Sequence, residues 1–325
     1  MNIDHIPAFS GRHPGPGPGG ALGTPHLPKG ATVSHAATEI FSQPSCWADA
    51  SELAGQVNAL LPSPGERVAV VGCGTSFNMA LAYARLREDA GHGLTDAMAA
   101  SEVLRSRQYD HYLFISRSGT TSEVLDVAAS LPPGARAAAL TVGPGTPLGE
   151  MVPGIMLPFA SEQSVVQTRF ASSALVLLRS HLGEDTSGLA AQAELALAQP
   201  LPQATPRASR FTFVGSGWTV GLAHEAALKL REAAQMWTES YAAKELRHGP
   251  ISVLDGESVV WCFGPAPEGL ESDVRATGAT FVASSLDPLA ELVRAQRVAV
   301  ELAGAKGLDV DHPRNLSFSV VLGSA

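Results

Sequence analysis

The sequence has few cysteines, an excess of acidic over basic residues, and no long hydrophobic run. Its three cysteines, Cys46, Cys73 and Cys262, lack the paired spacing of a metal site, and so sparse a count is typical of a reducing cytoplasm. The formal net charge of −9 disfavours a nucleic-acid-binding surface. No apolar run approaches membrane-spanning length, and the N-terminus lacks the hydrophobic region of a signal peptide. We therefore expect a cytoplasmic protein without nucleic-acid or membrane partners.

The 325 residues are enough for two domains of ordinary size. Residues 1–30 are rich in glycine and proline, which disfavour helices and central strands, so this segment is predicted to be a flexible tail. Prolines at positions 200, 202 and 206 indicate a linker. We predict a first domain with N-terminal helices over residues 31–200, and a second domain with a C-terminal loop over residues 201–325.

A strand followed by a glycine turn and a helix occurs twice. The first copy has a predicted strand at 67–72, the turn GCGTS at 72–76 and a helix at about 78–88. It lacks the third glycine of the dinucleotide fingerprint. The second copy has a strand at 211–214, the turn GSG, and a helix at about 220–236. We therefore predict an α/β protein of two similar halves, each with a mostly parallel sheet under helices. Further predicted strands are residues 112–116, 136–142, 154–158, 258–263 and 279–284, and further predicted helices are 34–56 (broken near 43–44), 123–131, 170–182 and 288–306.

Residues 116–122 (SRSGTTS), which we call the hydroxyl loop, gather five hydroxyl side chains at the start of a predicted helix. Backbone N–H groups at a helix N-terminus have no intrahelical partner, and such a loop suits a phosphate monoester. The lysine of a GK[ST] phosphate loop is missing, which disfavours a nucleoside triphosphate. The alternative is a helix cap, for which one hydroxyl is enough. We favour a phosphate site.

The predicted helix at 220–236 carries Glu225, Lys229 and Glu232 on one face, because the positions i, i+4 and i+7 align. The loop that follows this helix contains His248 just before Gly249-Pro250. A carboxylate and a cation on one helical face, with a histidine nearby, can carry out proton transfer. The alternative is a solvated helix with surface ion pairs and a surface histidine.

The order of these motifs resembles the double sugar-isomerase (SIS) domain family, most of all the isomerase half of glucosamine-6-phosphate synthase and the SIS-type amino-sugar phosphate deaminases. The resemblance covers the chain from residue 36 onward. It implies two similar flavodoxin-like SIS domains in tandem, each with a mostly parallel sheet in a three-layer αβα arrangement, and it implies no metal and no cofactor. The motifs are Glu39-Ile40 with Gln43-Pro44, CGTS at 73–76, SRSGTTS at 116–122, ALKLRE at 227–232, YAAKELRHGP at 241–250 and GLDVDHPRNL at 307–316.

The resemblance also implies roles for individual residues. Glu232 matches the base that moves a proton between C1 and C2 of the open-chain sugar, and Lys229 matches a second active-site lysine. His248 matches a ring-opening histidine that reaches the site from a neighbouring subunit, so a homodimer is expected. The implied ligand is a hexose or hexosamine 6-phosphate. Its binding positions are Gly74, Thr75, Ser76, Ser116, Arg117, Ser118, Thr121 and Val165, with Arg117 replacing the glutamine usual in the synthase.

Two departures from the family pattern bear on activity. No glutaminase segment is present, so we expect no hydrolysis of glutamine. The family lysine that forms an imine with the open sugar is replaced by Phe318, which cannot act as a nucleophile. We predict an amino-sugar 6-phosphate deaminase/isomerase acting on substrates of the glucosamine 6-phosphate/fructose 6-phosphate type. The alternatives are an aldose–ketose isomerase, a deglycase, and a catalytically silent phosphosugar-binding regulator.

Overall fold

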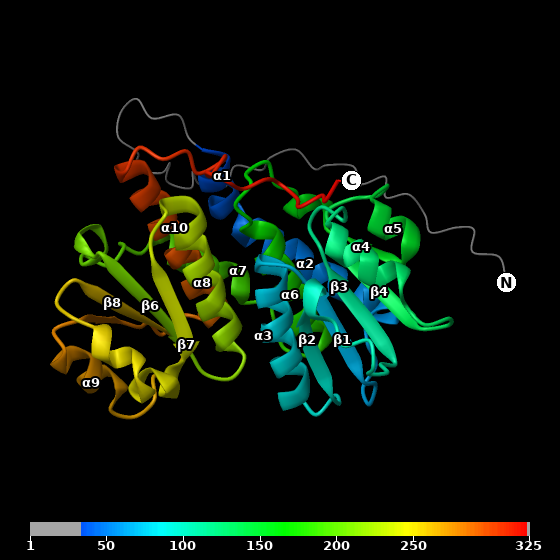
Figure 1. Cartoon of the computed structure of the whole chain (residues 1–325), viewed down its shortest axis with the longest axis horizontal. Coiled ribbons are helices and arrows are strands. Elements are labelled where there is room, and N and C mark those ends of the chain that lie inside the picture. Colours follow the sequence, from blue (N-terminus) through cyan, green and yellow to red (C-terminus); the bar gives the residue numbers. More distant parts are fainter. Residues whose placement is uncertain (1–33, 324–325) are drawn as a thin grey trace. The chain divides into compact units, whose positions relative to one another are not determined.

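Residues 34–323 are described in this computed structural model, and they form two parallel β-sheets with helices around them (Figure 1). The segment predicted as a tail lies outside the described residues. Apolar, β-rich runs such as residues 68–71 form the central strands, as their composition favours. The strands of the first sheet are β1 (Val68–Gly72), β2 (Thr95–Ala99), β3 (His111–Ile115), β4 (Arg136–Thr141) and β5 (Gly154–Met156), in the order β2-β1-β3-β4-β5.

The second sheet repeats the strand order of the first four strands of the first sheet. Every neighbouring pair of strands in both sheets is parallel, with β1 between β2 and β3 in one sheet. The loops that leave the carboxyl ends of these strands therefore gather along one edge of each sheet. The strands of the second sheet are β6 (Arg210–Gly215), β7 (Thr238–Ala242), β8 (Ser258–Phe263) and β9 (Thr280–Val282), in the order β7-β6-β8-β9.

Local sequence explains where several helices begin and end. Ser34 caps the first helix by accepting the Ala37 N–H, and Asp287 caps the last by accepting the Leu289 N–H ahead of a proline at the first helical position. The helices are α1 (His35–Phe41), α2 (Gln43–Val57), α3 (Thr75–Asp89), α4 (Ser122–Ala129), α5 (Pro147–Met151), α6 (Arg169–His181), α7 (Leu189–Ala198), α8 (Thr219–Ala234), α9 (Leu270–Ala276) and α10 (Pro288–Ala305). Short 3₁₀ turns are η1 (Asn58–Leu60), η2 (Ala100–Glu102), η3 (Pro158–Ala160), η4 (Thr205–Arg207), η5 (Ala243–His248) and η6 (Pro250–Val253).

Alternate side chains of the first sheet pack against two different layers of helices. In β1, Val68 and Val70 face the core formed with α2, α3 and α6, whereas Ala69 and Val71 face the core formed with α4 and α5. The sheet is thus covered on both faces, as a parallel sheet requires. The predicted α/β class with parallel sheets is confirmed.

One hydrophobic core extends from the first sheet to the second through α3 and α8. These two helices approach closely at Gly221, where an added Cβ would lie 2.5 Å from the backbone oxygen of Asn78. Helix α7 precedes the proposed domain boundary near residue 200 in the sequence, and it packs against α10, which follows that boundary. Because the core is continuous across this boundary, the division into tandem domains stays a prediction.

Most predicted elements are present, with ends shifted by a few residues. Helix α3 begins at Thr75, three residues earlier than expected, and α8 ends where Gln235 adopts a left-handed conformation, with φ of 51°. The edge strands β2 (TDAMA) and β7 (TESYA) were not predicted, because acidic residues and alanine are poor strand formers. Within residues 34–323, no helix has the length and apolar character needed to cross a membrane.

Candidate functional site

The hydroxyl loop follows β3 and leads into α4. Strand β3 is the parallel neighbour of β1, so this loop and the glycine turn at 72–76 lie at the same edge of the first sheet. In open α/β sheets, ligands bind outside the carboxyl ends of the strands. Gly119 makes the tight loop possible, because its φ is +63° and an added Cβ would lie 2.5 Å from Thr146 Oγ1.

Most hydroxyls of the loop are not used to cap α4. Thr121 is the N-cap residue, yet its side chain makes no capping hydrogen bond. The hydroxyls of Ser118 and Thr120 donate to Ser319 Oγ over 3.1 Å and 2.9 Å, and the Thr121 hydroxyl lies 3.4 Å from the same atom. Ser116 Oγ accepts the Gly119 N–H within the loop. The helix-cap alternative therefore does not account for this set of side chains.

Arg117 points out of the loop and links it to two other segments. Its Nη1 donates to Glu162 Oε2 over 3.0 Å, and both of these side chains are almost completely buried. Its remaining hydrogen bonds go to backbone oxygens, those of Ser164 and Val165 at 2.9 Å and 3.2 Å and that of Phe318 at 3.0 Å. The Arg117 guanidinium also lies 3.8 Å from the centroid of the Phe318 ring. In this arrangement Arg117 organises the site, with its charge directed at the chain's own groups.

A second cluster joins α3 to α8 and contains Lys229, which is 1% exposed. Lys229 Nζ lies 2.6 Å from Glu232 Oε2, 3.3 Å from Glu225 Oε1 and 2.9 Å from Thr75 Oγ1. Asn78 Nδ2 donates to the other oxygen of Glu225 over 2.9 Å. We call Thr75, Glu225, Lys229 and Glu232 the lysine cluster. Two neighbouring residues of the turn at 72–76 differ in role, since Gly74 is the N-cap residue of α3 and Thr75 contacts the lysine.

Burial determines the electrostatics of the lysine cluster. The side chains of Glu225 and Lys229 are each 1% exposed, so the solvated-helix alternative is wrong. Burial by itself lowers the pKa of Lys229, but the carboxylates of Glu225 and Glu232 raise it above the ordinary lysine value. Burial also raises the pKa of Glu225. Glu232 is 20% exposed and is thus the carboxylate of the cluster that a ligand can reach.

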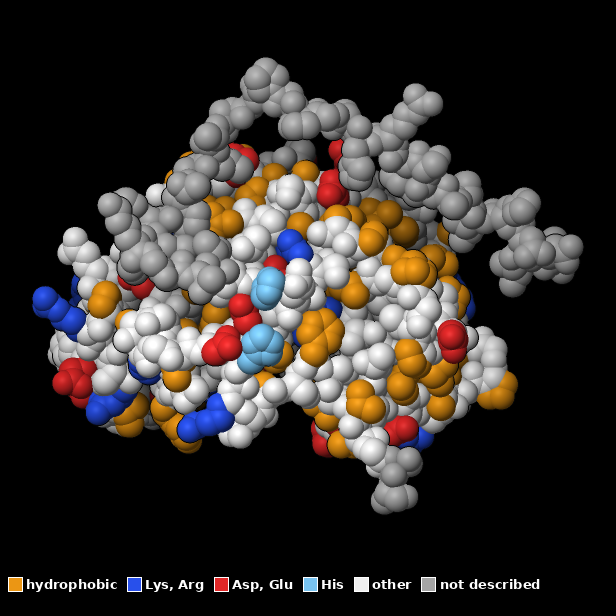
Figure 2. Space-filling model, turned by 90° about the horizontal axis from the view of Figure 1, so that it is seen from above, with side chains coloured by type: hydrophobic (Ala, Val, Ile, Leu, Met, Phe, Trp, Pro, Cys, Tyr) orange, Lys and Arg blue, Asp and Glu red, His pale blue; other side chains and the backbone are white. Residues whose placement is uncertain are grey.

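His248 lies at the end of η5 and is exposed. Among residues 34–323, no hydrogen bond or ion pair joins its ring to Glu232 or to any other side chain. The single chain therefore does not bring His248 into the lysine cluster, and its predicted entry from a neighbouring subunit stays a prediction. Figure 2 shows histidine, acidic and basic side chains side by side near the middle of the face seen from above.

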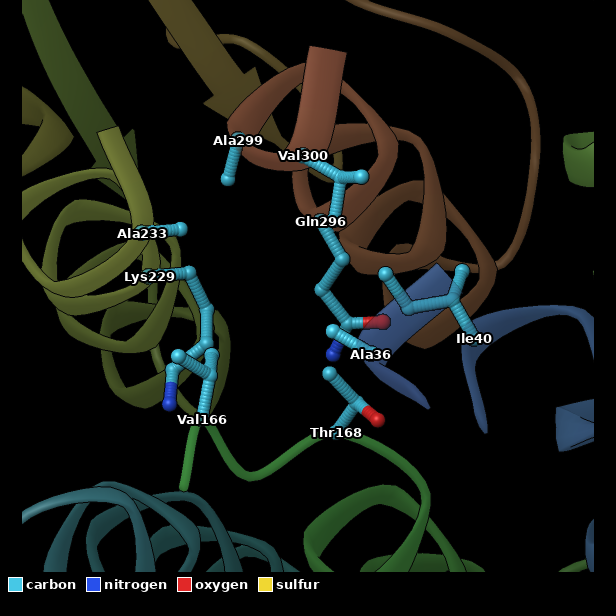
Figure 3. A pocket seen from close by; sticks show the side chains of 9 residues that line it. All are labelled: Ala36, Ile40, Val166, Thr168, Lys229, Ala233, Gln296, Ala299 and Val300. Carbon is cyan, nitrogen blue, oxygen red and sulfur yellow. The ribbon is translucent and has the colours of Figure 1, made fainter. Parts of the chain in front are cut away.

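A small pocket beside the lysine cluster lies between α1, α8, α10 and the segment 166–168 (Figure 3). Lys229 and Gln296 reach into it from α8 and α10, and Val166 and Thr168 close it from below. Its other walls are aliphatic. Val165 is next to this pocket: its N–H donates to the Asp311 backbone oxygen, which ties the segment to the C-terminal part of the chain.

Several residues that shape the site were given no site role of their own by the sequence prediction. Glu39 accepts the backbone N–H groups of Gln163 and Ser164 at 2.5 Å and 3.3 Å, and so holds the segment that carries Val165. Glu162 binds Arg117, and Glu225 binds Lys229. Glu225 was recognisable by its helical spacing, whereas no local sequence pattern indicates Glu162 or Ser319 as a partner of the hydroxyl loop.

Comparison with known proteins adds the family relationship. No protein-family model matches the chain. A glutamine–fructose-6-phosphate aminotransferase (isomerizing) from Thermus thermophilus is 29% identical, over 90% of this chain and 60% of the relative. The chain is a homologue of these aminotransferases. It spans 46–60% of the length of the curated relatives it matches. The resemblance inferred from the motifs is thus confirmed.

Two solved structures show the same fold. Glucosamine-6-phosphate deaminase from Thermotoga maritima superposes with a TM-score of 0.73 at 23% identity, over 89% of this chain and 100% of that one. The C-terminal domain of glucosamine–fructose-6-phosphate aminotransferase from Francisella tularensis gives a TM-score of 0.74 at 20% identity, over 88% and 100%. At these identities the likeness concerns the fold.

Proposed function

We propose that this chain binds a hexosamine 6-phosphate and converts it to the corresponding ketose 6-phosphate with release of ammonia. The substrates are of the glucosamine 6-phosphate/fructose 6-phosphate type. The observation that carries the proposal is the contact of 2.6 Å between buried Lys229 and partly exposed Glu232, in a cluster whose Thr75 lies at the same edge of the first sheet as the hydroxyl loop. The names of the relatives, which include both an aminotransferase and a deaminase of amino-sugar phosphates, support the substrate class.

The chemistry requires one base and one cationic partner. Glu232 takes the proton from C2 of the open-chain amino sugar and returns it to C1, while a second proton passes from the amine nitrogen to the C1 oxygen, which leaves an imine at C2 and a hydroxyl at C1. Water then adds to the imine carbon, and ammonia leaves as the ketone forms, so the reaction consumes one water for each ammonia released. The ammonium of Lys229 stabilises negative charge that develops on the sugar oxygen during the proton shift.

The phosphate end of the substrate provides orientation. The hydroxyls of Ser118, Thr120 and Thr121 converge on one point, and the N-terminus of α4 begins directly behind them. A phosphate bound there gains hydrogen bonds from hydroxyls and from free backbone N–H groups. Binding energy at this non-reacting end fixes the position of C1 and C2 relative to the base.

The test removes the base and keeps its shape. Glu232→Gln should reduce ammonia release from glucosamine 6-phosphate, and proton exchange at C2 in heavy water, by roughly a hundredfold or more. Glu301→Gln, which changes an exposed carboxyl of α10, is the matched control and should retain both rates. Equal exchange rates in the parent and Glu232→Gln would refute the role of the base.

Phe318 favours a second candidate function. Because no lysine stands at this position, the chain lacks the family's imine-forming group, and a simple aldose–ketose isomerisation of a hexose 6-phosphate needs only the base and the phosphate site. Interconversion of glucose 6-phosphate and fructose 6-phosphate without ammonia release from any hexosamine phosphate would favour this isomerase. Binding without turnover of either sugar would favour the silent regulator.

The proposal includes a homodimer that shares its sites. His248 is exposed and, within the described residues, forms no hydrogen bond or ion pair with Glu232, as expected of a residue that serves the other subunit. Mixing two inactive variants, Glu232→Gln and His248→Ala, should restore activity at about a quarter of the sites, since half of randomly formed dimers have one intact site. No recovery after subunit exchange, verified by light scattering, would refute the shared site.

A further inference from the structure

The two carboxylates beside Lys229 lie in different environments. Lys229 Nζ is 2.6 Å from Glu232 Oε2 and 3.3 Å from Glu225 Oε1. The side chain of Glu232 is 20% exposed, whereas the side chains of Glu225 and Lys229 are each 1% exposed. A ligand can therefore reach Glu232, while Glu225 is enclosed by the protein.

Helix α3 holds both carboxylate oxygens of Glu225. Thr75 Oγ1 donates to Oε1 over 3.1 Å, and Asn78 Nδ2 donates to Oε2 over 2.9 Å. Thr75 Oγ1 also accepts a hydrogen bond from Lys229 Nζ over 2.9 Å. The two helices approach closely here, because an added Cβ at Gly221, one turn before Glu225, would lie 2.5 Å from the Asn78 backbone oxygen. The carboxylate and the ammonium are thus fixed to α3 and to each other.

The charge of Lys229 depends on these carboxylates. The other polar side chains that line the small pocket with Lys229 are uncharged, namely Gln296 from α10 and Thr168 from the segment 166–168. Burial lowers the pKa of Lys229, but Glu225 and Glu232 raise it above the ordinary lysine value. Burial also raises the pKa of Glu225, and the Lys229 ammonium and the Asn78 N–H oppose that shift. The ammonium and the enclosed carboxylate therefore stabilise each other.

The proposed reaction removes one of the two counter-charges during each turnover. When Glu232 takes the proton from C2, it becomes a neutral carboxylic acid and no longer balances the ammonium. A buried ammonium without a counter-charge releases its proton readily, and the neutral amine that remains cannot stabilise negative charge on the sugar oxygen. Glu225 is enclosed and takes no proton from the substrate, so it balances the ammonium throughout the turnover.

We propose that Glu225, held by Asn78, is the positioning residue that keeps Lys229 an ammonium at a fixed point while Glu232 carries the substrate proton. This inference rests on the proposed role of Glu232 as the base. The exposed carboxylate transfers the proton, and the enclosed carboxylate maintains the positive charge that faces the sugar oxygen. Helix α3, from the first half of the chain, thereby supports the chemistry carried out by α8.

The test follows proton exchange at C2 of glucosamine 6-phosphate in heavy water from pH 6.5 to pH 9.5. The parent should retain its rate on the alkaline side, because the pKa of Lys229 is raised. In Glu225→Gln the rate at pH 9 should be about tenfold lower than at pH 7, because the lysine loses its proton. Glu291→Gln is the matched control, since Glu291 is also almost completely buried and pairs with Arg294 over 2.9 Å. Its pH profile should match that of the parent.

Asn78→Ala is a second variant, which leaves every charge in place and tests the inference even if Glu225→Gln does not fold. It removes the hydrogen bond to Glu225 Oε2, so we expect a smaller decrease, about threefold, between pH 7 and pH 9. Profiles of both variants that parallel the parent profile would overturn the inference and leave the proposed base intact. Exchange by Glu232→Gln at the parent rate would instead overturn the proposed function.

Discussion

His111 should make the stability of this protein depend on pH below neutrality. The residue begins β3, is 1% exposed, and neither ring nitrogen has a hydrogen-bond partner among the described residues. Burial, reinforced by the positive charge of Arg136, lowers the pKa of His111 to about 4, whereas Glu66, 3.7 Å from Nδ1, opposes this effect. The folded protein therefore disfavours the charged imidazole.

The magnitude follows from the difference between the folded and unfolded states. An unfolded histidine has a pKa of about 6.5, so the difference of about 2.5 pKa units corresponds to up to about 3 kcal/mol. Because the folded pKa is the lower one, this stability is fully present above pH 6.5 and is lost as the pH falls toward 4. Over that range the unfolded state binds more protons than the folded state.

Urea unfolding measured from pH 8 to pH 4.5 tests the prediction. Between these limits the free energy of unfolding of the parent should fall by about 2–3 kcal/mol more than that of His111→Gln, which cannot titrate. Comparing the two proteins is necessary because burial raises the pKa values of Glu39 and Glu225, which changes stability in the opposite direction at acid pH. Parallel curves for the two proteins would refute the reasoning about His111.

The remaining predictions concern packing, the site and the route of nitrogen release. Gly221→Ala should lower the free energy of unfolding in urea by about 1–3 kcal/mol, because its Cβ would meet the backbone of α3. Gly55→Ala is the control: it lies in α2 with open space around it, so the substitution should be neutral or stabilising. Equal effects of the two substitutions would contradict the close approach of α3 and α8. Glu39→Ala should raise the KM for the sugar phosphate several-fold, because two backbone hydrogen bonds are lost. Glu39→Gln should have a KM close to that of the parent, because the amide oxygen still accepts the two N–H groups. An unchanged KM for Glu39→Ala would show that these hydrogen bonds do not position the substrate. Borohydride reduction during turnover should trap no sugar adduct, and an adduct mapped to Lys229 by mass spectrometry would refute the imine-free route.

The sequence predicts those features whose causes are local. The central strands are β-rich apolar runs, and the hydroxyl loop follows one of them, so both were recognisable from neighbouring residues. The edge strands β2 and β7 form because a parallel neighbour accepts them, which their own composition does not reveal. The helix face with Glu225 and Lys229 was likewise only partly predictable. Its spacing was visible, but its burial depends on α3, some 150 positions earlier in the chain.

Partners that lie far away in the sequence could not be predicted in this way. The resemblance implied a ligand-binding role for Arg117, and this role stays a prediction. The sequence did not reveal that its charge is directed at Glu162 and at three backbone oxygens, which only the folded chain brings together. Ser319 meets the loop across about 200 positions, and no residue near either segment signals this contact. Long-range pairs of this kind follow from the topology of the fold, which periodicity and local motifs do not reveal.

The lysine cluster and Phe318 together disfavour a reaction in which the protein forms an imine with the sugar. An imine forms only from a neutral amine, and the carboxylates of Glu225 and Glu232 raise the pKa of Lys229, so its ammonium is the dominant form near neutral pH. Phe318 supplies no amine either, and its ring is held against Arg117. Under the proposed function, the amine of an amino sugar would therefore be released by water acting on a substrate imine, with Lys229 as a fixed positive charge beside the base. The same arrangement, without an amine on the substrate, would perform the alternative proposed reaction, an aldose–ketose isomerisation. If both proposed reactions use this arrangement, the substituent at C2 of the sugar decides whether ammonia is a product, and the protein need not rearrange.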